Sequence, residues 1–178
     1  AVQQNLVENG TFEENVVIPS NPGHQPWSGY GWATYPICTS CIDVIPGNGG
    51  LVAVLADSAN RTSVYNGRVN ATNLYASQSL TNIVGGGTYR FSMKMKTENL
   101  VNSDAYAEIT WSSTEGGVTP IPGVAAVRLG VTSGSKDWFT FTSPVLTAPA
   151  SATKVKLILS VRPRVLGPGD SNGKAYFD

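Results

Sequence analysis

Short segments in which apolar and polar residues alternate recur along the chain, and strong breakers of regular structure separate them. Over 89–96 the apolar members are Tyr89, Phe91, Met93 and Met95, with a polar residue after each. The same alternation occupies 105–112 and 155–162. A period of two puts the apolar side chains on one face of a strand, as in an antiparallel sheet with one buried face. Further candidate strands are 5–8, 42–45, 51–56, 74–80, 125–131, 138–142 and 174–178.

Glycine-rich turns, such as 47–50 and 85–87, divide these segments, and no window shows sustained helical periodicity. The 178 residues fit one domain, 1–178. About ten strands in one domain predict an all-β, two-sheet antiparallel β-sandwich of the jelly-roll type. Its expected core includes Phe91, Met93, Trp111, Phe141, Leu157 and Leu159.

The segment 19–37 differs from the rest, because four prolines interrupt it. Proline cannot donate a ladder hydrogen bond, so we expect a long loop without strand pairing. This loop carries the aromatic residues Trp27, Tyr30, Trp32 and Tyr35.

The composition excludes several classes of partner. Charged residues make up 13% of the chain and the formal net charge is zero, which argues against nucleic acid. No apolar stretch is long enough for a membrane span. The beginning Ala1–Gln4 is typical of a mature chain whose signal peptide has been removed, so we expect an extracellular or cell-surface protein.

A set of short segments occurs in an order that resembles the carbohydrate-binding modules grouped as families 4, 9, 16 and 22. The segments are 5–13 (NLVENGTFE), 61–67 (RTSVYNG), 87–92 (GTYRFS), 138–142 (WFTFT), 148–155 (APASATKV) and 174–178 (KAYFD). The resemblance spans nearly the whole chain. It implies a β-sandwich jelly roll without enzymatic activity, a structural calcium site, and polysaccharide or glycan binding through aromatic rings.

The resemblance places Tyr65 where the family has a stacking tryptophan, with Arg61 and Asn66 beside it. Aromatic planes stack on the apolar faces of sugar rings, while polar neighbours bind the hydroxyls. Trp27, Tyr30 and Trp32 are further candidate ligand contacts, since they lie among glycine, serine and proline. The alternative for these rings is that they cap one end of the core.

The resemblance also implies a calcium ion (Ca2+) held by Glu13 and Asp178, with the carbonyl of Gly50 as a third ligand. Calcium takes several oxygen ligands and mixes carboxylates with backbone carbonyls. The alternative is that both carboxylates are solvated or paired with Lys174.

Cys38 and Cys41 lie three residues apart in a chain with a single histidine. They cannot make a zinc site alone, and no βαβ pattern supports a redox motif, so we expect a disulfide and an oxidising compartment. Candidate N-glycosylation sites are Asn9, Asn60 and Asn70. A glycan on Asn60 would cover the face around Tyr65.

Catalytic machinery has little support, because the sequence shows no nucleophile elbow and no phosphate loop. The first functional hypothesis is therefore a non-catalytic carbohydrate-binding module. The second, of a different class, is a structural subunit of an extracellular surface layer or filament. Such a subunit would bind copies of itself by pairing Ala1–Leu6 with a neighbour's sheet, with or without calcium.

Overall fold

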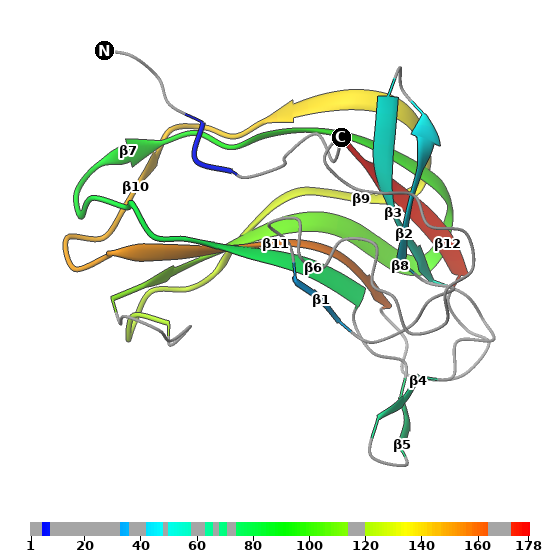
Figure 1. The fold of residues 1–178 in the computed structure, drawn as a ribbon, viewed down its shortest axis with the longest axis horizontal. Coiled ribbons are helices and arrows are strands. Elements are labelled where there is room, and N and C mark those ends of the chain that lie inside the picture. Colours follow the sequence, from blue (N-terminus) through cyan, green and yellow to red (C-terminus); the bar gives the residue numbers. More distant parts are fainter. Residues whose placement is uncertain are drawn as a thin grey trace.

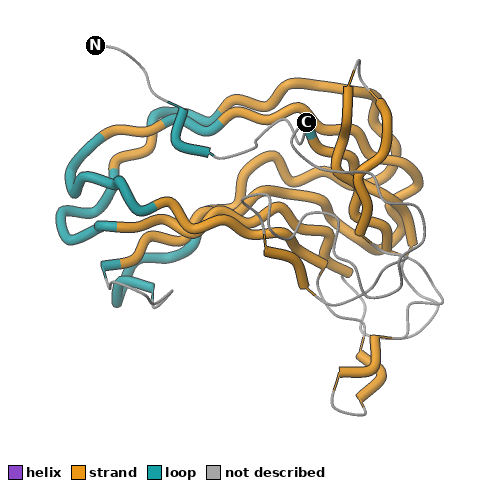
Figure 2. The backbone as a smooth tube through the Cα atoms, in the orientation of Figure 1, coloured by secondary structure: helices purple, strands orange, loops and turns teal. Residues whose placement is uncertain are grey.

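The computed structural model of the chain describes residues 5–7, 33–35, 42–47, 50–57, 63–65, 68–70, 74–113, 120–163 and 172–178. These residues form strands, turns and loops, and none of them forms a helix (Figure 2). Within this part of the chain, accordingly, no helix is long and apolar enough to cross a membrane.

Most of the predicted segments lie in strands, and further strands were not predicted. In chain order they are β1 (Ala33–Tyr35), β2 (Ile42–Gly47), β3 (Gly50–Asp57), β4 (Ser63–Tyr65), β5 (Arg68–Asn70), β6 (Leu74–Leu80), β7 (Thr88–Tyr89), β8 (Ser92–Ser112), β9 (Val127–Thr142), β10 (Leu146–Thr147), β11 (Lys154–Pro163) and β12 (Asn172–Phe177).

Two layers of antiparallel strands face each other, and β8 and β9 contribute to both (Figure 1). Layer A has the order β2-β3-β12-β8-β9, with 92–101 of β8 and 134–142 of β9. Layer B has the order β1-β6-β11-β8-β9, with 103–112 of β8 and 127–132 of β9. The predicted two-layer β-sandwich is therefore confirmed.

The crossing from one layer to the other is made by a bend in the middle of β8 and β9. The pairing of these strands shifts register repeatedly between Met95 and Ala107. On β8, Asn99 and Asn102 have positive φ values of 50° and 52°, which asparagine tolerates better than most residues. The segments 89–96 and 105–112 were expected as separate strands, and 125–131 and 138–142 likewise. The bend instead joins 92–96 to 105–112 within β8, and 127–131 to 138–142 within β9, whereas Tyr89 belongs to β7.

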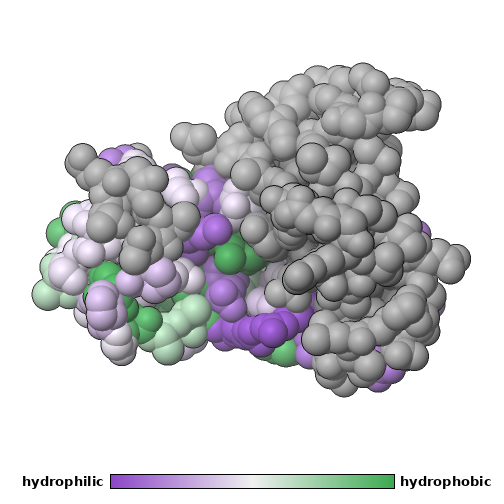
Figure 3. Space-filling model, turned by 90° about the horizontal axis from the view of Figure 1, so that it is seen from below, coloured by the Kyte–Doolittle hydropathy of each residue, from purple (hydrophilic) through white to green (hydrophobic). Residues whose placement is uncertain are grey.

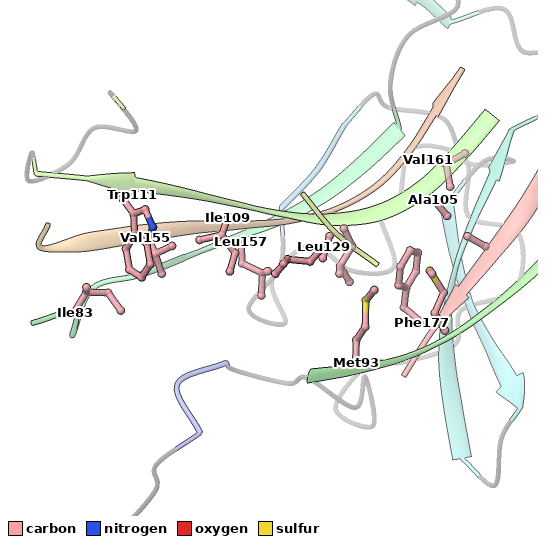
Figure 4. Close-up of a cluster of buried hydrophobic side chains, with 14 of the residues drawn as sticks. Ile83, Met93, Ala105, Ile109, Trp111, Leu129, Val155, Leu157, Val161 and Phe177 are labelled. Atoms are coloured by element: carbon pink, nitrogen blue, oxygen red, sulfur yellow. The ribbon is translucent and has the colours of Figure 1, made fainter. Parts of the chain in front are cut away.

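The core lies between the layers and contains the predicted alternating residues (Figure 4). Met93 and Met95 come from layer A, whereas Trp111, Leu157 and Leu159 come from layer B. Phe177 of β12 is 1% exposed and is the largest fully buried side chain among the described residues. Phe91 and Phe141 are only partly buried and pack against this core rather than within it, so the prediction placed them too deep.

Two predictions about the N-terminal part are wrong. Residues 33–35 of the expected loop form β1, which pairs with β6. This is possible because the triplet contains no proline and lies at the edge of layer B. Asn5, Leu6 and Val7 lie outside the strands, although 5–8 was expected to be one, and the amide of Val7 donates instead to the side chain of Asn5. Self-association through Ala1–Leu6 stays a prediction.

Candidate functional site

The outer face of layer B carries a set of polar side chains on adjacent strands. On β8 and β11 the buried residues alternate with outer-face positions, so Glu108 faces Ile158 and Thr110 faces Lys156 across the ladder. Glu108 also faces Arg128 of β9. Residues directly opposite each other in an antiparallel pair lie close enough to interact. Figure 3 looks at the molecule from this side, and hydrophilic residues gather in the middle of its coloured part.

An ion pair fixes the centre of this face. The Nε atom of Arg128 donates to Oε2 of Glu108 at 3.1 Å, and the side chains are 45% and 20% exposed. The guanidinium also lies over the ring of Tyr106, with Cζ 4.7 Å from the ring centroid. Arginine stacks readily on aromatic faces, so the ring and the carboxylate together set the orientation of Arg128.

Tyrosine positions cross layer B in a row two residues away from this ion pair along the strands. Tyr106 of β8 pairs with Ser160 of β11, Ser160 pairs with Tyr75 of β6, and Tyr75 pairs with Tyr35 of β1. Tyr106 itself is 3% exposed, although its position alternates with the inward Ala105 and Ala107. Its ring therefore supports Arg128 and offers little surface to a ligand in this conformation.

This arrangement can bind a polyhydroxylated ligand. The carboxylate of Glu108 accepts hydrogen bonds, the guanidinium of Arg128 donates them, and the hydroxyl of Thr110 does both. Because each lies on a paired strand, the spacing between them is fixed before a ligand arrives.

A second polar cluster lies on the outer face of layer A. The hydroxyl of Tyr176 donates to Oε2 of Glu98 at 2.9 Å, and Nζ of Lys96 lies 3.3 Å from Oε1 of the same carboxylate. The ring of Trp138 contacts Tyr176 at a centroid distance of 6.4 Å. This cluster joins β8, β9 and β12.

The hydrogen bond shifts both partners' pKa values. Donation from Tyr176 is the largest cause that lowers the pKa of Glu98, and Lys96 lowers it further. Burial, followed by the bond to Glu98, raises the pKa of Tyr176 to about 12. The phenol therefore stays protonated and keeps donating throughout the neutral range.

The predicted ligand-binding residues are not gathered on either face by the described part of the structure. Tyr65 ends β4, which pairs only with β5 in a small two-stranded sheet that projects from the layers (Figure 1). Asn70, a candidate glycosylation site, ends β5. The remaining predicted residues lie outside the described residues: Trp27, Tyr30, Trp32, Arg61, Asn66, Glu13, Cys38, Cys41, Asn9 and Asn60.

Two of the three predicted calcium ligands lie on neighbouring strands. Gly50 begins β3, and Asp178 directly follows β12, which pairs with β3. The amide and carbonyl of Asp178 exchange hydrogen bonds with Lys94, both at 3.0 Å. Among the described residues no group of three histidine, cysteine, aspartate or glutamate side chains could hold a metal ion. The calcium site stays a prediction, because Glu13 lies outside them.

Part of the site on layer B could be predicted from the sequence. The alternation over 105–112 already put Tyr106, Glu108 and Thr110 on the face opposite the core. An aromatic residue and a carboxylate on the polar face of one strand are a usable signal for a site. The partnership with Arg128 requires the register of β8 with β9, which no local pattern reveals.

The chain matches no protein-family model and no curated protein sequence. Solved structures share its fold. A family 16 carbohydrate-binding module aligns over 98% of this chain and 96% of its own, with a TM-score of 0.57 and 15% identity. A family 61 carbohydrate-binding module in complex with β-1,4-galactotriose aligns over 99% and 95%, with a TM-score of 0.53 and 12% identity.

A third similar structure is the enzymatically active domain of tailspike protein 4 from bacteriophage CBA120, with a TM-score of 0.55 and 13% identity. The alignment covers 97% of this chain but only 20% of the tailspike chain. The fold is thus that of carbohydrate-binding modules, as the resemblance implied, and it also occurs within a larger protein.

Proposed function

We propose that this protein is a non-catalytic, extracellular module that binds a polysaccharide on the outer face of layer B. The observation that carries the proposal is the fixed group of Glu108, Arg128 and Tyr106 on one sheet of a carbohydrate-binding-module fold. Hydrogen bonds to charged groups contribute about 1.5–3 kcal/mol each. After the cost of ordering the sugar, micromolar to millimolar affinity is expected.

Aromatic stacking is the second part of the proposal. Tyr75 and Tyr35 occupy the same row of the sheet as Tyr106, on the far side of Ser160, so a sugar chain bound at Glu108 and Arg128 would reach their positions. Tyr106 and Ser160 are buried, so neither of them would add stacking surface. Tyr65, together with Trp27, Tyr30 or Trp32, would extend the contact beyond the layer. Each ring would add about 1 kcal/mol.

The test is affinity electrophoresis against xylan, β-1,4-galactan and a mixed-linkage β-glucan. We expect at least one polysaccharide to retard the wild-type protein, and the Glu108→Gln variant to bind it about tenfold more weakly. Tyr75→Ala should weaken binding of the same polysaccharide to a similar extent.

The matched control is Glu98→Gln, which removes an ion-paired carboxylate from the outer face of layer A. This variant should bind as the wild type does. Retardation by none of the polysaccharides, or an equal loss in the two glutamate variants, would contradict binding on layer B.

A further inference from the structure

A cavity of about 670 Å³ opens between the two layers at the end of the sandwich beside β7 and β10. Ile109, Val155 and Leu157 of layer B line one side, and Phe91 and Leu146 line the other. Trp111 lies at this end near Ile83 and Val155 (Figure 4). The volume is in the range of sites that bind small organic ligands, which are typically clefts lined by apolar side chains.

A cavity of this size is unusual between the layers of a sandwich. Protein interiors are packed as closely as organic crystals, and voids larger than a water molecule are few. The remainder of this core follows that rule, since Met95, Val161 and Phe177 are fully buried. An open apolar space of this size beside such packing is characteristic of a surface that receives another molecule.

The polar groups that line the cavity indicate the chemistry of that molecule. Arg90 is the single charged residue among the described residues that line it, and none of them is acidic. Arg90 is exposed, whereas its neighbour Phe91 is partly buried against the core. A guanidinium next to an apolar cavity pairs well with a carboxylate at the end of an apolar ligand.

A β-strand from another molecule fits the cavity less well. Strand addition needs unpaired backbone groups, and several backbone groups around the cavity are already bonded. The amide of Phe91 donates to Oγ of Ser143, the amide of Ser143 donates to the carbonyl of Phe91, and the amide of Ala148 donates to the carbonyl of Gly87. Their distances are 2.9, 2.8 and 2.9 Å.

The geometry points to a second binding site, for an amphiphilic carboxylate whose apolar body lies between the layers and whose carboxylate pairs with Arg90. This site is separate from the proposed polysaccharide face and does not depend on it. Tyr89, whose ring lies 5.9 Å from that of Trp111, and Trp111 itself would both contact the apolar body.

Decanoate, below its micellar concentration, is the probe, and calorimetry with tryptophan fluorescence follows its binding. Decanol and decyltrimethylammonium serve as neutral and cationic comparisons of the same chain length. We expect saturable binding of decanoate at one site per chain, weaker binding of decanol, and the weakest binding of the cation. Arg90→Gln should lower the affinity for decanoate about tenfold and leave the affinity for decanol unchanged.

A blocking variant tests the location. Val145 lines the cavity and is 55% exposed, so Val145→Trp should narrow the cavity mouth without disturbing the fold. The affinities for decanoate and for decanol should both fall at least tenfold. The matched control is Val131→Trp, because Val131 is 56% exposed and does not line the cavity. Absence of saturable binding, or equal effects of the two tryptophan variants, would overturn the site. Equal decanoate affinity in the wild type and Arg90→Gln would overturn the role of the carboxylate.

Discussion

Core side chains contribute different amounts to the stability of this sandwich, and Phe177 contributes one of the larger amounts. It is 1% exposed and comes from the last described strand, so its ring ties β12 to the core. Truncation of a large aromatic residue in a packed core costs about 3–5 kcal/mol. We expect Phe177→Ala to lose stability in this range in urea unfolding. Phe91→Ala should lose less, because Phe91 is only partly buried; a larger loss for Phe91 would contradict this ranking.

The bond between Tyr176 and Glu98 gives a pH-dependent prediction. Because the pKa of Tyr176 rises from 10.0 to about 12, this bond's contribution to stability is complete below pH 10 and is lost as the pH rises through about 12. A tyrosinate absorbance titration should show a tyrosine that ionises near pH 12, and Tyr176→Phe should remove that step. Glu98→Gln should move the step toward 10, whereas Glu108→Gln should leave it in place.

At the scale of the strands, the bend of β9 depends on two glycines with positive φ, Gly130 at 65° and Gly134 at 71°. A residue with a side chain at either position would lower the stability by about 1–2 kcal/mol, because it would have to adopt the left-handed backbone conformation. A methyl group at Gly130 would also meet Cε of Met93 at 2.6 Å, whereas at Gly134 it would meet nothing within 4 Å. We expect Gly130→Ala to lower the free energy of unfolding by about 1 kcal/mol more than Gly134→Ala does. Equal losses would show that Met93 moves aside without cost.

The faces of the strands could be read from the sequence, but their connections could not. Alternation is a local pattern, so Trp111, Leu157 and Leu159 were placed in the core correctly. The joining of 92–96 to 105–112 depends on shifted register and on positive φ at Asn99 and Asn102, for which a strand pattern has no signal. The candidate site follows the same division: Glu108 was on the predicted polar face, but its partner Arg128 is set by pairing between distant segments.

For the molecule as a whole, we propose that calcium stabilises the sandwich through Glu13, Gly50 and Asp178. Gly50 and Asp178 belong to the β3 and β12 side of layer A. A ligand at a hundredfold excess over its dissociation constant stabilises the native state by about 2.7 kcal/mol. Chelation should therefore lower the melting temperature, and Asp178→Asn should be less sensitive to the chelator. Asp137→Asn is the control, since Asp137 lies on β9, which pairs with β8 and not with β3 or β12. An unchanged melting temperature in chelator would argue against the ion.

The two strands that pass through both layers give the sandwich a hinge. At the bend the layers are joined by the continuous backbone of β8 and β9, so they cannot separate there without breaking the strands' own pairing. At the opposite end, β7 and β10 are two residues long each and pair only with each other. Thermal opening should therefore widen the cavity mouth at β7 and β10, while the two layers stay in contact at the bend. Amide hydrogens of β7 and β10 should exchange before those of Val155–Val161, and a molecule that enters between the layers would slow exchange at the mouth first.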